Sequence, residues 1–96
     1  MQPIHILGIA GSLRRASWNA GLLRAAGELL PAGVTLEVFD LAPLPFYNQD
    51  IDNPEQIPAA ARELREKVRA ADALIFATPE YNHSIPAVLK NAIDWA

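Results

Sequence analysis

The sequence predicts an α/β fold with a parallel sheet, and two observations support that prediction. Three short apolar runs alternate with three stretches whose apolar residues recur at helical spacing, giving the order βαβαβα. Strands that alternate with helices in this way form parallel sheets with right-handed crossovers. Helices cover both faces only if the two crossovers run in opposite directions from the first strand. We therefore expect the spatial strand order 2-1-3, with a switch point between strands one and three.

The first strand and helix are expected in the N-terminal third of the chain. The run Ile4–Ile9 is short and apolar and is followed by glycine-containing sequence, as expected of a strand. Ser17 can cap a helix that begins near Trp18, and Pro31–Gly33 stops that helix. The predicted core face of this helix consists of Leu22, Leu23, Ala26, Leu29 and Leu30.

The second strand and helix follow after that stop. Val34–Phe39 alternates apolar and polar residues over most of its length, which is typical of a strand near a sheet edge. The proline-containing stretch Asp40–Asn53 is predicted to be a loop, and Pro54 or Pro58 then opens the helix. Its expected apolar stripe is Ala61, Leu64, Val68 and Ala71. Its wet face carries two expected i,i+4 pairs, Arg62–Glu66 and Glu63–Lys67.

The third strand, Ala73–Ala77, is apolar at every position, as in a strand buried on both faces. The helix after it begins near Pro86 and is expected to turn inward Val88, Leu89, Ala92 and Ile93. In the order 2-1-3 this strand would form an edge with unpaired backbone groups. We therefore expect the chain to be a piece of a larger domain, or to pair this edge with another copy of itself or with another chain, and to be poorly stable as an isolated monomer.

Composition narrows the class of protein. A chain of 96 residues is one small domain at most, and its net charge of −3 argues against nucleic-acid binding. The sequence has no cysteine, which excludes disulfides and thiolate metal sites, and His5 and His83 are not in metal-ligand spacing. It shows no apolar run of about 18 residues and no signal-peptide layout. We expect a cytoplasmic protein without a membrane partner.

A polar turn follows the first strand, where open α/β sheets bind ligands. Gly8 and Gly11 let the backbone approach closely or take positive φ, Arg14 or Arg15 offers charge, and the following helix offers free N–H groups. The side-chain donors are Ser12, Ser17 and Asn19. The turn matches neither the Walker sequence nor Gly-x-Gly-x-x-Gly. We expect a phosphate here; the alternative is that Ser17 only caps the helix and the arginines are solvated.

A second polar turn follows the third strand. It contains Glu80, Tyr81, Asn82, His83 and Ser84, and Pro79 and Pro86 would stiffen it at both ends. A flat aromatic ligand could lie on this backbone and on Tyr81. In the order 2-1-3 the two turns are neighbours, which suggests one ligand held by both.

Each of these side chains also has a structural explanation. Ser84 is suited to capping the third helix, and Glu80 to accepting bonds from local backbone donors. A lone loop histidine such as His83 is more often solvated than catalytic. Trp18 and Trp95 are better explained as packing residues than as ligand stackers.

Three motifs, in order and spacing, resemble the NADPH-dependent FMN reductase family along almost the whole chain. That family includes chromate, quinone and azo-dye reductases with a flavodoxin-like fold. The motifs are Gly11–Arg14 with Ser17 and Asn19; Leu44–Asp50; and Pro79–Asn82 with Ser84, Leu89–Asn91 and Asp94–Trp95.

The resemblance implies a three-layer α/β/α domain with FMN bound non-covalently at the switch point. The family's phosphate-binding loop maps to Ser12, Arg14, Ser17 and Asn19. The loop beside the ribityl chain and isoalloxazine maps to Pro79, Glu80, Tyr81, Asn82 and Ser84. Lys90, Asn91 and Asp94 also belong to the family pattern, and we assign them to structure or subunit contact. Family members are nearly twice as long, with a glycine-rich third loop and fourth and fifth strands that are absent here. Residues 1–96 are therefore expected to be the N-terminal part of a single flavodoxin-like FMN-binding domain.

The resemblance also implies an activity, an FMN-dependent NAD(P)H oxidoreductase. A hydride passes from NADPH or NADH to FMN, and the electrons then pass to a quinone, chromate, an azo compound or free flavin. No side chain is needed as nucleophile or general acid, so we expect no catalytic residue. The longer protein is expected to be a homodimer or homotetramer.

Other classes of function were weighed against this one. One alternative is a non-catalytic flavin or nucleotide-phosphate binder that needs a C-terminal half or a partner. A receiver-type signalling domain shares the strand order but needs acidic residues after strand one, where this chain has Gly8–Ser12. The two polar turns argue against a purely structural or interaction module.

Overall fold

The computed structural model describes residues 2–11, 18–78 and 87–96, with the backbone alone for residues 18–20. Its elements follow the predicted alternation of strands and helices. They are β1 (Ile4–Ala10), α1 (Trp18–Glu28), β2 (Val34–Phe39), the 3-10 turn η1 (Gln49–Ile51), α2 (Ala59–Ala70), β3 (Ala73–Ala77) and α3 (Ala87–Trp95). No helix in this part of the chain is long and apolar enough to cross a membrane.

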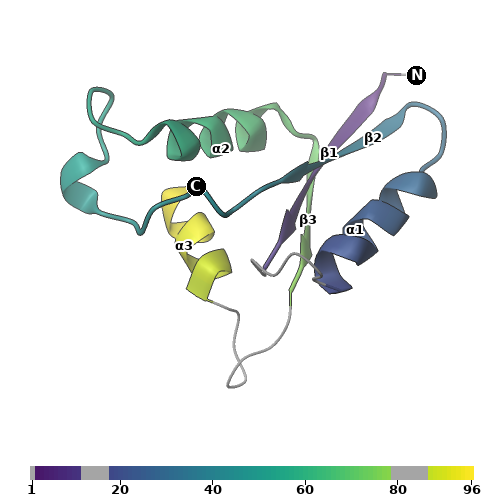
Figure 1. The fold of residues 1–96 in the computed structure, drawn as a ribbon. Helices are drawn as coiled ribbons and strands as arrows, with labels where there is room; N and C mark the ends of the chain where they lie inside the picture. Colours follow the sequence, from purple (N-terminus) through teal and green to yellow (C-terminus); the bar gives the residue numbers. More distant parts are fainter. Residues whose placement is uncertain (1, 12–17, 79–86) are drawn as a thin grey trace.

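The sheet confirms the predicted topology. All three strands are parallel and lie in the order β2-β1-β3, with Ile6 of β1 opposite both Leu36 of β2 and Ala73 of β3. The helices form two outer layers, with α1 on one face of the sheet and α2 and α3 on the other (Figure 1). The first crossover therefore runs from β1 to β2, and the second runs in the opposite direction, from β2 past β1 to β3. This places β1 at the centre and gives the sheet its switch point.

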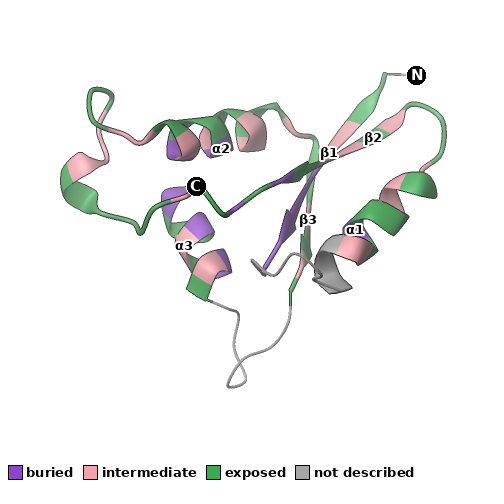
Figure 2. Cartoon of the chain, viewed as in Figure 1, coloured by how far each residue is buried: buried purple, intermediate pink, exposed green. Residues whose placement is uncertain are grey.

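The main core lies between the sheet and the pair α2 and α3. Buried residues of α2, α3 and β1 form one cluster there, and Figure 2 shows buried positions on each of these elements. The fully or nearly fully buried members are Leu7, Ile9, Phe39, Leu41, Ala61, Leu64, Leu89, Ala92 and Trp95. Trp95 has no exposed surface, which confirms the prediction that it is a packing residue.

The predicted core face of α1 is only partly correct. Leu23 is buried against Gly8, where a Cβ atom would lie 3.3 Å from its side chain, but Leu22 is 63% exposed and Leu29 is 85% exposed. Adjacent helix positions point about 100° apart, so burying Leu23 turns Leu22 away from the sheet. Leu29 lies beyond the end of α1, where the helical spacing no longer applies.

The second helix follows directly on Pro58, which decides between the two prolines considered as its start. Ala61 and Leu64 are completely buried, as the predicted stripe requires. The predicted i,i+4 pairs are not the main contacts of these side chains. The hydrogen bond to Glu37 is the main cause that raises the pKa of Lys67, and Glu63 helps to raise it electrostatically. Lys67 pairs with Glu37 of β2, and Arg62 donates to the carbonyl of Pro54, because partners from other segments compete for these long side chains.

The inward face of the third helix also differs from the prediction. Leu89, Ala92 and Trp95 are buried, but Ile93 is 48% exposed and lies beside Leu74 and Phe76 of β3. Among the described strands β3 pairs with β1 alone, so its other edge is open. The apolar side chains on this part of β3 and α3 are therefore only half-covered by the described residues.

Candidate functional site

The carboxyl ends of β1 and β3 lie side by side. Ala10 is the register partner of Ala77, and the N–H of Gly11 donates to the carbonyl of Ala77 at 2.8 Å. Segments 12–17 and 79–86 therefore start from adjacent positions at the same edge of the sheet. This geometry brings together the starting points of the two polar turns that the sequence predicts to bind one ligand.

Gly11 allows this close approach. A Cβ atom on Gly11 would lie 2.7 Å from Oγ1 and 3.0 Å from Cβ of Thr78, closer than real Cβ contacts come. The expected close approach of a ligand to the backbone at Gly8 and Gly11 stays a prediction; what the structure shows is that Gly11 leaves room for Thr78 of the neighbouring strand end. Neither glycine takes positive φ; among the described glycines that conformation occurs at Gly33, with φ of 84°.

Each of the two segments runs directly into a helix. Helix α1 begins at Trp18, where the sequence predicted it, and α3 begins at Ala87. The first turn of a helix presents free N–H groups and a partial positive charge, which favour an anion. The start of α1 therefore suits the phosphate that the first turn was predicted to bind.

The predicted cofactor-binding side chains themselves lie outside the described residues. Asn19 is placed by its backbone in the first turn of α1, but its side chain is not described. The others are Ser12, Arg14, Ser17, Pro79, Glu80, Tyr81, Asn82 and Ser84. Their roles stay predictions, and the described residues supply the frame from which they project.

A third segment, the loop after β2, is attached to α3. The side chain of Asn91 donates to the carbonyl of Pro45 at 2.7 Å and accepts from the N–H of Tyr47 at 2.7 Å. The indole N–H of Trp95 donates to the same Pro45 carbonyl at 2.7 Å, and the rings of Tyr47 and Trp95 meet edge to face at 4.8 Å. Asn91 therefore has the structural role that was expected of it.

The far end of this loop is tied to α2 and α3 by a polar cluster. The hydroxyl of Tyr47 donates to Asp52 at 2.9 Å, and Arg65 pairs with Asp52 at 2.8 Å while its Nε donates to the carbonyl of Trp95 at 2.7 Å. The hydroxyl of Tyr47, and then the guanidinium of Arg65, hold the pKa of the Asp52 carboxyl below its ordinary value. The same bond to Asp52 raises the pKa of Tyr47.

Sequence reasoning did not predict that Asn91 and Trp95 of α3 would bind the 44–52 loop at Pro45 and Tyr47. The only available signal was that Leu44–Asp50 and Leu89–Asn91 both belong to the motifs of the family resemblance.

The fold and its ligand edge define a class of protein, the open α/β domains that bind a ligand at the switch point of a parallel sheet. Two of the solved structures that share this fold illustrate the similarity. One is FerB, a flavoenzyme NAD(P)H:(acceptor) oxidoreductase from Paracoccus denitrificans, with a TM-score of 0.87 and 33% identity over 97% of this chain and 50% of that one. The other is Smu.1420 from Streptococcus mutans, with a TM-score of 0.71 and 26% identity over 95% and 52% of the two chains. The fold is flavodoxin-like.

Residues 4–96 match the NADPH-dependent FMN reductase family, and the chain belongs to that family. It is 52% identical over 93 residues to an NAD(P)H-dependent FMN reductase of Pseudomonas aeruginosa, covering 97% of this chain and 50% of that protein. It is 46% identical over 99 residues to an NAD(P)H:quinone oxidoreductase of Solanum tuberosum, covering 99% and 51%. It is 43% identical to a 2-hydroxy-1,4-benzoquinone reductase of a Burkholderia species, covering 97% and 50%. The chain thus spans about half the length of the curated relatives it matches.

Proposed function

We propose that this chain forms part of an FMN-dependent NAD(P)H oxidoreductase that delivers electrons to a small acceptor. The observation that carries the proposal is the pairing of the ends of β1 and β3, joined by the bond from Gly11 to Ala77. Each strand end continues through a short segment into a helix, in a chain that belongs to the FMN reductase family.

The described frame fits FMN. Two adjacent strand ends offer one ligand two neighbouring loops, and a helix start offers its phosphate N–H donors. We assign the phosphate to Ser12, Arg14, Ser17 and Asn19, with the guanidinium of Arg14 as the charged partner. We assign the ribityl chain and the ring system to Pro79, Glu80, Tyr81, Asn82 and Ser84.

Bound FMN would supply the redox chemistry, accepting a hydride from NADPH or NADH and delivering electrons to the acceptor. The protein's part is to hold and orient the cofactor, so no side chain is assigned as nucleophile or general acid. Backbone N–H groups near the pyrimidine ring would stabilise negative charge on the reduced ring. The names of the relatives favour a quinone or free flavin over chromate and azo compounds.

The location and assembly of the protein follow from the sequence expectations and the family. We propose a cytoplasmic protein that functions as a homodimer or homotetramer in its longer form. These proposals do not affect the assignment of the site.

A second candidate function is supported by the open edge of β3. Leu74 and Phe76 are 41% and 46% exposed there, and the chain spans only half the length of its relatives. In this second proposal the chain binds flavin or a nucleotide phosphate but turns over only when further polypeptide completes the domain.

Oxidation of NADPH separates the two proposals. The chain, loaded with FMN, is mixed with NADPH and menadione, alone and after addition of a separately produced C-terminal half of the P. aeruginosa relative. Turnover by the chain alone supports the first proposal, and turnover only after the addition supports the second. A folded, FMN-loaded chain that is inactive in both arms overturns the oxidoreductase assignment.

A further inference from the structure

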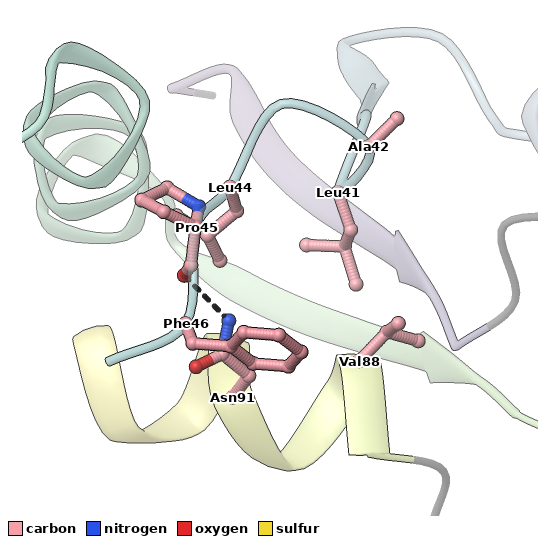
Figure 3. A pocket seen from close by; sticks show the side chains of 7 residues that line it. All are labelled: Leu41, Ala42, Leu44, Pro45, Phe46, Val88 and Asn91. Carbon is pink, nitrogen blue, oxygen red and sulfur yellow. Dashed lines mark hydrogen bonds between the residues drawn. The ribbon is translucent and has the colours of Figure 1, made fainter. Parts of the chain in front are cut away.

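An apolar pocket lies between the loop after β2 and the start of α3. Its volume is about 160 Å³, and its lining residues are Leu41, Ala42, Leu44, Pro45, Phe46, Val88 and Asn91. In Figure 3 the side chains of Leu41, Leu44 and Phe46 point from the loop toward the first turns of α3, and Val88 points back toward Leu41. Phe46 is 85% exposed, which places this aromatic ring at the mouth of the pocket.

The shape of the pocket is fixed by hydrogen bonds. Asn91 holds the loop at both Pro45 and Tyr47, and Trp95 holds Pro45 a second time. The loop and α3 therefore keep their spacing without a ligand. A pocket that exists before binding does not have to spend binding energy on ordering its walls.

The described lining of the pocket suits an uncharged ring. Among the described residues that line it, Asn91 is the only one with a polar side chain, and both ends of that amide are already used within the protein. None of these described lining residues is charged, so they offer no partner to chromate, an anion that would have to be desolvated. It is also smaller than the pockets of about 300–1,000 Å³ that hold drug-sized ligands, which argues against a flavin as occupant.

The pocket lies at the ligand-binding edge of the sheet. Leu41 and Ala42 follow the carboxyl end of β2, and Val88 is the second residue of α3. Helix α3 begins where segment 79–86 ends, so the pocket adjoins the end of that segment. This is the edge at which an open parallel sheet places its ligands.

We propose that this pocket is the subsite for the ring of a quinone acceptor, an inference that rests on the proposed oxidoreductase function. Leu41, Leu44 and Val88 form its floor and Phe46 its aromatic wall. The pocket admits the ring and leaves ring substituents in solvent, and it selects quinones over anionic acceptors.

The test uses two variants that change the pocket at exposed positions. Ala42→Leu fills the pocket, and Phe46→Ala removes its aromatic wall. Leu29→Phe is the matched control, since it enlarges an exposed apolar side chain that lies outside the pocket. Backbone amide shifts are followed by NMR during titration with menadione, with and without FMN. The absence of cysteine removes the thiols that would otherwise react with the quinone.

Saturable shifts at Ala42, Leu44 and Val88 are expected in the unmodified chain. The affinity should fall about tenfold in Ala42→Leu and in Phe46→Ala, the scale of losing an apolar ring contact, and should be unchanged in Leu29→Phe. In the NADPH assay, the same two variants should raise the KM for menadione and leave turnover with ferricyanide unchanged.

Absent shifts, shifts elsewhere in the chain, or equal affinity in all four proteins would overturn the assignment. The titration needs no redox activity, so its outcome is separate from that of the proposed function. A chain that binds menadione here but does not oxidise NADPH, either alone or with the added C-terminal half, would refute the oxidoreductase proposal and retain the pocket as a quinone-ring site.

Discussion

Arg14 and Arg15 are adjacent in the segment between β1 and α1, and the proposed function gives them different roles. Only Arg14 is assigned to the cofactor phosphate. A charge-assisted hydrogen bond contributes about 1.5–3 kcal/mol, so Arg14→Ala should weaken FMN binding by about 10- to 100-fold. Arg15→Ala is the matched control and should change the affinity by about twofold or less. Flavin fluorescence titrations measure both, and equal effects would contradict the assignment.

Substitution of Gly11 by alanine tests the importance of the contact between the ends of β1 and β3. The Cβ atom of Gly11→Ala would meet Oγ1 of Thr78 at 2.7 Å and its Cβ at 3.0 Å, so the Thr78 side chain must rotate and the ends of β1 and β3 must give way. We predict a stability loss of about 1–3 kcal/mol in urea unfolding, together with weaker FMN binding. Gly8→Ala should cost less, because its new Cβ would meet the flexible ends of the Leu36 and Leu23 side chains at the longer distances of 3.2 and 3.3 Å. A Gly8→Ala variant that is the less stable of the two would argue against this explanation.

At the scale of elements, the cluster around Asp52 predicts a pH dependence. Its pKa is lowered from 3.8 by the Tyr47 hydroxyl first and by Arg65 second. A carboxyl whose pKa is lower in the folded state stabilises the fold above its unfolded-state pKa, and this stabilisation disappears as the pH falls through the folded-state pKa. Asp52→Asn should therefore lower the melting temperature at neutral pH, and the difference from the unmodified chain should shrink below about pH 4.

The control for this prediction is Asp50→Asn. The Asp50 carboxylate makes none of the contacts of Asp52 in the described part of the chain. Melting curves at several pH values should therefore show little difference for this variant at any pH. A difference for Asp52→Asn that stays constant from neutral pH to about pH 2 would show that the carboxylate charge is not what stabilises the loop.

The elements themselves could largely be predicted from the sequence, because their signals are local. Val34–Phe39 and Ala73–Ala77 appear with the predicted bounds, and Pro58 marks the start of α2. The errors concern which side of a helix is covered. Leu22 and Ile93 have the right spacing to be buried but are exposed. Periodicity predicts which residues share one side of a helix, but it does not predict how much of that side the sheet covers.

The attachment of the 44–52 loop to α3 could not be predicted in the same way. Pro45 and Trp95 are 50 residues apart in the sequence, and no period or spacing relates them. Likewise, Lys67 pairs with Glu37, 30 residues away, where local spacing favoured Glu63. Sequence reasoning predicted two ligand-binding turns from their residue types, but the pocket between the loop after β2 and α3 depends on contacts that only the folded chain shows.

At the scale of the whole molecule, the open edge of β3 predicts self-association. Its backbone groups are unpaired in the described sheet, and Leu74, Phe76 and Ile93 are half-exposed beside it. We predict that the melting temperature rises with protein concentration. Leu74→Lys should reduce both the association and its concentration dependence, since a charge on an edge strand discourages pairing. Leu29→Lys is the control at an exposed site away from the sheet edge.

Sedimentation and melting experiments at several concentrations would check this prediction. A confirmed monomer with a cooperative, concentration-independent melt would show that the open edge of β3 does not cause self-association.

The strand order depends only on the alternation of elements and the direction of two crossovers, which is why the order 2-1-3 could be predicted from the sequence. What covers β3 cannot be inferred from these 96 residues, which span half the length of the relatives.

The measurement that tests the central claim most directly is a titration of the 96-residue chain with FMN, followed by flavin fluorescence and visible absorption. The claim is that the segments after β1 and β3 form one flavin site. It predicts saturable quenching with a shifted flavin spectrum, and a weaker response from Arg14→Ala and Gly11→Ala. A folded sample that shows no saturable change would contradict the claim that these two segments are sufficient to bind the cofactor.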